Sequence, residues 1–171
     1  TCRAVLAACT RHMVSPPRLV LEPGRSIVGM AGLTLYAVGS RKEVPGIRTY
    51  VAVDGGMADN PRPITYGAEY VAEVADRSEP ATETVTIAGR YCESGDILIK
   101  DLALAPAQPG DTLAVFATGA YNYAMASNYN RCGRPAMVLV AGGTAEVIVE
   151  RETLDDLIRL DRLPDRLRTK P

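Results

Sequence analysis

The feature that most constrains this chain is a two-residue alternation of apolar and polar side chains, repeated in short runs without helical segments between them. Alternation with this period places every second side chain on one face of a β-strand. Proline-glycine pairs such as Pro45-Gly46 and Pro109-Gly110 separate the runs, as is typical of turns. Many strands at short spacing indicate an antiparallel sheet, closed into a barrel or packed as a sandwich. We therefore predict a mainly β fold.

The individual runs are recognised by this alternation or by their content of β-branched and aromatic residues. They span residues 33–38, 49–53, 70–75, 84–88, 97–104, 112–117, 137–141 and 145–149. The last two flank Gly142-Gly143-Thr144, a glycine-rich turn that suits a hairpin.

Both ends of the chain depart from this pattern. Residues 3–12 have apolar side chains at helical spacing, and residues 18–22 are predicted to form one short buried strand. A helix followed by a strand is typical of an α/β unit. We therefore expect residues 1–32 to be the end of such a unit, residues 33–150 to form the β domain, and residues 151–171 to form a terminal helix and tail. In that helix Thr153 would be the N-cap and Asp156 the acidic third position.

Composition and charge exclude several classes of function. With 47% hydrophobic and 23% charged residues, a chain of 171 residues can bury one sizeable core. Nineteen basic and 20 acidic residues give no strong field for nucleic acid or an anionic membrane. No apolar run approaches the roughly 20 residues that span a bilayer, and residues 1–10 lack the layout of a secretory signal. We expect a cytoplasmic protein that binds neither nucleic acid nor membrane.

The cysteines do not indicate a metal site. Cys2, Cys9, Cys92 and Cys132 are widely spaced without a C-x-x-C pair, and His12 is the single histidine. We expect free thiols in a reducing compartment. Spacing alone favours the interpretation of Cys92 as a small, buried apolar residue.

Two segments supply charged and phenolic groups near proline and glycine. In Glu22-Pro-Gly-Arg25, a turn brings a carboxylate and a guanidinium together, which suits a ligand with a cationic ring nitrogen and an anionic group, such as pyridoxal phosphate. The alternative is a turn with a surface ion pair. Arg62 and Tyr66 lie in a loop rich in proline and suit the capture of a carboxylate. The alternative is that they are solvated loop residues, which is the commoner case for a lone arginine. The glycines of Asp54-Gly-Gly-Met57 do not form a phosphate-binding fingerprint.

A third segment, Tyr91-Cys-Glu-Ser-Gly-Asp96, places a thiol beside a carboxylate in a loop between two predicted strands. A thiol can deliver a proton to a carbanion, and the carboxylate of Glu93 can bind an ammonium group. Tyr121 lies in a polar segment rich in tyrosine and asparagine, where core packing does not explain it. A ring and a hydroxyl beside a cofactor phosphate would explain it.

In residue identity and order these motifs resemble those of the diaminopimelate decarboxylases, which are fold-type III decarboxylases that use pyridoxal 5′-phosphate. The resemblance covers nearly the whole chain and makes Cys92 a candidate catalytic residue. It rests on Glu22-Pro-Gly-Arg25, Val53-Asp-Gly-Gly-Met57, Tyr66-Gly-Ala68, Cys92-Glu-Ser-Gly-Asp96, Gly119-Ala-Tyr121, Asn130, Gly133-Arg-Pro135 and Glu152-Thr-Leu-Asp-Asp-Leu157.

The resemblance implies roles at the cofactor. Glu22 would face the pyridine nitrogen and keep it protonated. Gly24 and Arg25 would lie at the cofactor phosphate, and Tyr121 would touch both cofactor and substrate. The substrate implied is meso-2,6-diaminopimelate, with L-lysine as product.

The resemblance also implies roles at the substrate. Arg25, Arg62 and Tyr66 would bind the distal carboxylate, and Glu93 would hold the distal amino group. Cys92 would protonate the α-carbon after carbon dioxide leaves. The loop with Cys92 would reach the active site of the other subunit, so a homodimer is implied.

One part of the family pattern has no counterpart in the sequence. Members carry a larger amino-terminal barrel of the TIM type, which provides the Schiff-base lysine, and residues 1–32 would be its last helix and strand. Neither Lys42 nor Lys100 stands in a matching motif. The chain is therefore expected to be an inactive carboxy-terminal fragment when alone. Two alternatives stay open: a non-catalytic remnant that acts as an interaction module, and a related decarboxylase of ornithine or arginine.

Overall fold

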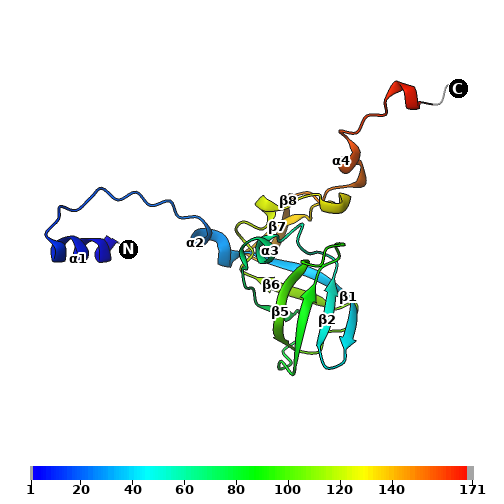
Figure 1. The fold of residues 1–171 in the computed structure, drawn as a ribbon, viewed down its shortest axis with the longest axis horizontal. Coiled ribbons are helices and arrows are strands. Elements are labelled where there is room, and N and C mark those ends of the chain that lie inside the picture. The colour runs from blue at the N-terminus through cyan, green and yellow to red at the C-terminus, as the bar shows by residue number, and fades with distance from the viewer. Residues whose placement is uncertain (1, 169–171) are drawn as a thin grey trace.

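The computed structural model describes residues 2–168 (Figure 1). Its helices are α1 (Cys2–His12), α2 (Arg25–Val28), α3 (Arg62–Tyr66) and α4 (Leu154–Ile158), with 3-10 helices η1 (Gly29–Ala31), η2 (Tyr123–Met125), η3 (Tyr129–Arg131) and η4 (Asp165–Leu167). Its strands are β1 (Leu33–Val44), β2 (Arg48–Val53), β3 (Ala72–Val74), β4 (Glu83–Ala88), β5 (Ile97–Leu104), β6 (Thr112–Phe116), β7 (Met137–Ala141) and β8 (Thr144–Val149).

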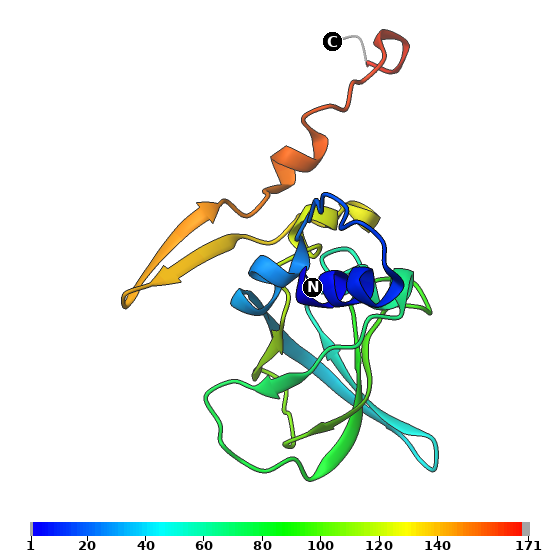
Figure 2. The same ribbon diagram turned by 90° about the vertical axis from the view of Figure 1, so that its left-hand side faces the viewer.

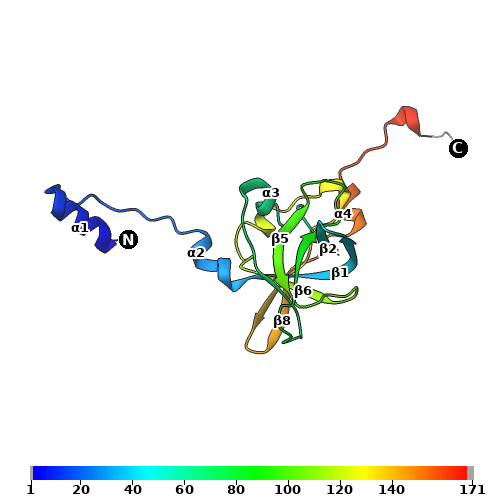
Figure 3. The same ribbon diagram turned by 60° about the horizontal axis from the view of Figure 1, so that its bottom comes forward.

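Six of these strands form one twisted sheet in the order β3-β6-β1-β2-β4-β5. The two outer strands, β3 and β5, also lie close to each other, so that the sheet curls into a nearly closed barrel (Figure 3). Seven of the eight predicted runs coincide with a strand to within one or two residues, and the eighth, 33–38, lies within the longer β1. The predicted mainly β fold is therefore confirmed.

One pair of strands differs from the antiparallel arrangement that we expected. β2 and β4 run parallel, with Val51 paired to Ile87, whereas the other neighbouring pairs of the sheet are antiparallel. A tight turn can join only antiparallel strands. Residues 54–82, which include α3 and β3, connect β2 to β4. This long connection allows the parallel pairing and places α3 at one end of the barrel.

The interior of the barrel follows from the two-residue period. On β1, Tyr36 and Val38 are buried, whereas Leu33 and Leu35 face outward and are exposed. Burying a large aliphatic side chain contributes about 1.5–3 kcal/mol, so the inward-facing set determines the register of each strand. The largest fully buried side chains belong to Ile87, Leu104, Leu113, Val51, Val85, Val115, Asn60 and Thr86.

The second sheet is the hairpin of β7 and β8, which projects from the barrel (Figure 2). Ala141 pairs with Thr144, and the turn between them consists of Gly142 and Gly143, with φ angles of 56° and 79°. Positive φ at both turn positions is the requirement of a type I′ turn, which glycine meets without strain. The predicted glycine-rich hairpin turn is confirmed.

The segments outside the barrel are helical or extended. α1 agrees with the predicted helix, and Thr153 caps α4 through a capping box with Asp156, as predicted. The predicted buried strand at residues 18–22 is wrong: the segment has no regular structure, and Val20 is 72% exposed. A strand is stabilised by a neighbouring strand, and this segment runs away from the sheet (Figure 1). The division of the chain at residues 32 and 150 stays a prediction.

Candidate functional site

Arg62 and Tyr66 lie on the short helix α3 rather than in a loop as predicted. Gly67 ends the helix in the left-handed conformation, and its N–H donates to the carbonyl oxygens of Arg62 and Pro63. Residues four apart share one face of a helix. Accordingly, the Arg62 Cζ lies 5.4 Å from the centroid of the Tyr66 ring. The helix therefore presents the guanidinium and the phenol together.

Tyr121 reaches the same place from a distant part of the sequence. It follows β6 in a turn and has a φ of 62°, an uncommon conformation for a residue other than glycine. Its ring centroid lies 5.6 Å from the Arg62 Cζ, so that the guanidinium lies near two tyrosine rings. Gly24 faces its hydroxyl: a Cβ on residue 24 would lie 2.6 Å from the Tyr121 oxygen. Four of the predicted site residues thus converge.

Arg25, the first residue of α2, contributes a buried guanidinium nitrogen. Its Cζ lies 5.8 Å from the centroid of the Tyr70 ring. Arg25 Nη1 and Arg62 Nε are buried and have no hydrogen-bond partner among the described residues. A buried donor without a partner costs about 1–3 kcal/mol. These two donors are therefore suited to an anionic ligand, for which charge-assisted hydrogen bonds are strongest.

Two buried asparagines that the sequence did not reveal support this cluster. Asn60 and Asn122 are 1% and 4% exposed. The Asn122 side-chain amide is oriented with its nitrogen facing two backbone carbonyls. It donates to the carbonyl oxygens of Thr118 (3.2 Å) and Ala120 (3.0 Å). These bonds hold the turn that carries Tyr121. Nothing in the local sequence separates such asparagines from the exposed ones nearby.

Glu22 is not joined to the cluster in the described part of the chain. It is exposed in the extended segment before α2, and within residues 2–168 its side chain makes no hydrogen bond or ion pair. Its predicted role at a pyridine nitrogen stays a prediction.

Cys92 and Glu93 lie on the surface in the loop between β4 and β5. Both side chains are exposed, so the interpretation of Cys92 as a buried apolar residue is wrong. Among the described residues, the Glu93 carboxylate accepts hydrogen bonds only from its neighbours, the Gly95 N–H at 3.3 Å and the Ser94 hydroxyl at 3.4 Å. Gly95 packs against the side chain of Ile64 on α3, since a Cβ at Gly95 would lie 2.5 Å from it. The loop therefore lies beside the helix that carries Arg62 and Tyr66.

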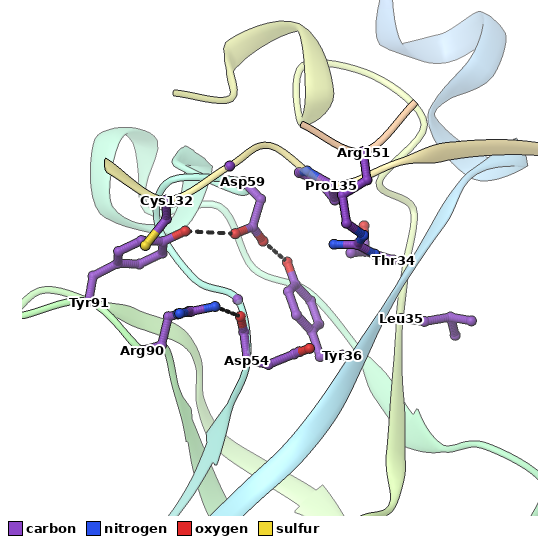
Figure 4. A pocket seen from close by; sticks show the side chains of 12 residues that line it. Thr34, Leu35, Tyr36, Asp54, Asp59, Arg90, Tyr91, Cys132, Pro135 and Arg151 are labelled. Atoms are coloured by element: carbon purple, nitrogen blue, oxygen red, sulfur yellow. Dashed lines mark hydrogen bonds between the residues drawn. The ribbon is translucent and has the colours of Figure 1, made fainter. Parts of the chain in front are cut away.

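Two carboxylates without a role in the sequence analysis contact Tyr91 of this loop: Asp96, which is buried, and Asp59, which is partly buried. Burial raises the pKa of both Asp59 and Asp96, against the effect of the hydrogen bonds that they accept. Asp59 accepts hydrogen bonds from the hydroxyls of Tyr36 at 2.6 Å and Tyr91 at 3.4 Å (Figure 4). Burial and the neighbouring Asp59 charge also raise the pKa of Tyr36.

Two cavities of the structure lie away from the converging residues. A polar cavity of about 120 Å³ lies beside Asp59 (Figure 4), and an apolar groove of about 830 Å³ lies between α3 and β5. Neither is lined by Arg25, Arg62 or Tyr121. Within residues 2–168 no three potential ligand side chains are grouped to hold a metal, and no helix is long and apolar enough to cross a bilayer.

Known proteins similar to this chain are decarboxylases. Residues 26–119 match the family described as pyridoxal-dependent decarboxylase, C-terminal sheet domain. Diaminopimelate decarboxylase of Synechocystis sp. is 60% identical over 165 residues, which are 96% of this chain and 35% of that protein. Diaminopimelate decarboxylase of Bacillus subtilis is 56% identical over 92% of this chain and 36% of its own length.

Solved structures lead to the same group. The crystal structure of diaminopimelate decarboxylase from M. jannaschii in complex with L-lysine is 41% identical, with a TM-score of 0.85, over 96% of this chain and 38% of that chain. The chain thus spans about a third of the length of the relatives that it matches. The match over residues 26–119 and the high identities show that the chain belongs to the family of pyridoxal-dependent decarboxylases and contains its C-terminal sheet domain.

Proposed function

We propose that this chain is the carboxy-terminal part of a diaminopimelate decarboxylase, which converts meso-2,6-diaminopimelate into L-lysine and carbon dioxide with pyridoxal 5′-phosphate. The observation that carries the proposal is the convergence of Gly24, Arg62, Tyr66 and Tyr121 from three distant segments, beside two buried guanidinium nitrogens without partners. The identities of 60% and 56% to named diaminopimelate decarboxylases support the choice of substrate.

The residues present fit the cofactor. Arg25 offers a buried donor to the phosphate, and Gly24 leaves the space that a side chain would fill beside the Tyr121 hydroxyl. Glu22 would supply the carboxylate for the ring nitrogen, which is a role for this chain that the resemblance implies. Pyridoxal phosphate, when bound, acts as the electron sink for the carbanion that forms when carbon dioxide leaves.

The remaining residues would bind the substrate and hold a proton. The Arg62 guanidinium, next to the Tyr66 and Tyr121 rings, can bind the distal carboxylate in a bidentate manner. Glu93 would accept hydrogen bonds from the distal ammonium group. Cys92 would hold the proton that the α-carbon receives, and its exposure leaves the thiol accessible to a substrate.

We further propose a homodimer in which the loop of Cys92 and Glu93 serves the site of the partner subunit. In the part of the chain that the structure describes, no hydrogen bond or ion pair joins either side chain to Arg25, Arg62 or Tyr121. A cytoplasmic location is proposed because the four cysteines are free thiols.

The test begins with the coding sequence around the chain. The protein that it encodes is expressed and incubated with pyridoxal phosphate and, separately, meso-diaminopimelate, ornithine and arginine. Lysine and carbon dioxide should form from diaminopimelate alone. Turnover of ornithine or arginine would favour a related decarboxylase, and no turnover of any substrate would favour the interaction module.

A further inference from the structure

The loop between β4 and β5 carries two candidate functional groups without anchoring them through their side chains. Cys92 and Glu93 are exposed, and within residues 2–168 the Glu93 carboxylate accepts hydrogen bonds only from the two residues that follow it. The position of the thiol and of the carboxylate therefore depends on the backbone of residues 91–95. What holds that backbone determines where both groups lie.

Asp96 holds the backbone of the loop from inside. Its residue is 3% exposed, and its two carboxylate oxygens accept from two different segments: Oδ1 from the Met57 N–H at 2.7 Å and Oδ2 from the Tyr91 N–H at 2.8 Å. Its carbonyl oxygen also accepts from the Gly89 N–H at 2.9 Å. Hydrogen bonds to an ionised carboxylate are about twice as strong as neutral ones. Asp96 thereby joins the loop to the connection that follows β2.

Two glycines leave the space that this carboxylate occupies. A Cβ on Gly56 would lie 2.5 Å from Asp96 Oδ1, and a Cβ on Gly89 would collide with the same carboxylate. Both glycines therefore allow the close approach of the carboxylate to the backbone. The Asp96 carboxylate is therefore bound by two backbone N–H groups in a space that two glycines leave open.

Asp59 holds the other end of Tyr91. The Tyr91 hydroxyl donates to Asp59 Oδ1 at 3.4 Å, while the Tyr36 hydroxyl of β1 donates to Oδ2 at 2.6 Å (Figure 4). The Tyr91 ring also packs edge-on against Tyr129, with 5.9 Å between centroids. Tyr91, the residue directly before Cys92, is thus held at its backbone by Asp96 and at its hydroxyl by Asp59.

We propose that Asp96, assisted by Asp59, is a positioning residue that holds Tyr91 and thereby places the Cys92 thiol and the Glu93 carboxylate. The value of that placement for decarboxylation rests on the proposed function. The placement itself is a property of the chain and can be measured without cofactor or substrate.

Asp96→Asn is the sharpest substitution because it changes one atom. An asparagine has one acceptor oxygen, so its amide nitrogen would face either the Met57 or the Tyr91 N–H, donor against donor. Asp111→Asn is the matched control. Asp111 accepts from the Gln108 N–H at 2.7 Å in the turn before β6, and it holds no part of the Cys92 loop.

The measurement uses the charge selectivity of Cys92 in a chain that carries Cys2→Ser, Cys9→Ser and Cys132→Ser. Rates of thiol modification are compared for a cationic and an anionic methanethiosulfonate, and the ratio reports how the Glu93 charge lies relative to the thiol. A unit charge about 6 Å from a thiol raises the rate of the cationic reagent and lowers that of the anionic one, each roughly threefold in water, so complete loss of its effect changes the ratio about tenfold. Asp96→Asn should shift the ratio by about threefold toward that of the free peptide 91–96, and Asp111→Asn should leave it unchanged. Tyr91→Phe should give a smaller shift in the same direction.

An unchanged ratio in folded Asp96→Asn would overturn the proposal. If Asp96→Asn does not fold, hydrogen exchange of the unsubstituted chain decides: the amides of Met57 and Tyr91 should be protected and Ser94 should exchange quickly, whereas rapid exchange at Tyr91 would equally overturn it. A shifted ratio together with no decarboxylation would refute the proposed function and leave the positioning role standing.

Discussion

The hydroxyl of Tyr121 lies directly against Gly24, although the two residues are 97 positions apart in the sequence. A Cβ on residue 24 would lie 2.6 Å from the Tyr121 oxygen. The contact joins the segment before α2 to the turn after β6. Arg62 on α3 lies near the same ring, with 5.6 Å between its Cζ and the ring centroid.

Gly24→Ala should displace the Tyr121 side chain and weaken cofactor binding while leaving the fold intact. Loss of one hydrogen bond from an exposed tyrosine corresponds to roughly tenfold in affinity, about 1.4 kcal/mol. The free energy of unfolding should stay within about 0.5 kcal/mol because the displaced hydroxyl is on the surface. Titration of the whole protein with pyridoxal phosphate measures the change. Gly39→Ala, whose Cβ meets no atom closer than 3.8 Å, is the control, and equal affinities of the two variants would contradict the expectation.

Glu152→Gln should destabilise the base of the hairpin. The Glu152 carboxylate accepts from Arg134 Nε at 2.9 Å and from the Arg134 N–H at 2.8 Å, and these bonds lower its pKa to about 2. We expect a loss of about 1–2 kcal/mol at pH 7, since these are charge-assisted bonds near the surface. The neighbouring Glu150, which is exposed, provides the control Glu150→Gln.

The same pair predicts the direction of a pH effect. The pKa of Glu152 is lower in the folded protein than the usual value of 4.5, so the carboxylate contributes stability above pH 4.5 and loses it as the pH falls toward 2. The difference between the original chain and Glu152→Gln should therefore be full at pH 7 and small near pH 2. Urea unfolding at a series of pH values measures it. A difference that grows in acid would show that the pair is not formed.

Leu113→Ala should test the barrel core. Leu113 on β6 is fully buried, and its removal leaves a cavity that costs about 2–5 kcal/mol. Leu35→Ala on the neighbouring strand β1 removes the same number of atoms from a side chain that is 60% exposed, and it should cost less than about 0.5 kcal/mol. Chemical denaturation of both variants gives the comparison. Equal losses would be inconsistent with the observed register of β1.

Cys92→Ala in the whole protein should reduce turnover by about a hundredfold or more, the usual contribution of a positioned proton donor. The absorbance of the bound cofactor should not change, because the thiol is not expected to hold the cofactor. Cys132→Ala, at a partly buried thiol beside the polar cavity, is the control. Turnover that survives Cys92→Ala would remove this residue from the mechanism.

The sequence by itself determined the local structure. The period of two located the strands of the barrel because side chains alternate across a strand whatever its neighbours are. Gly142-Gly143 determined the hairpin turn, and Thr153 with Asp156 determined the start of α4, since these signals act over a few residues. The residue identities and order of the motifs indicated the candidate site residues, and the family comparison agrees with that resemblance.

Only the tertiary structure decided which of these residues meet. The parallel pairing of β2 and β4 and the failure of residues 18–22 to form a strand depend on which neighbours each segment finds. Asp96 stood in a recognised motif, yet its role emerged only from its bond to Met57, a residue 39 positions away. Burial and long-range contact are properties of the packed chain, because a side chain's neighbours are determined by topology and not by its own sequence context.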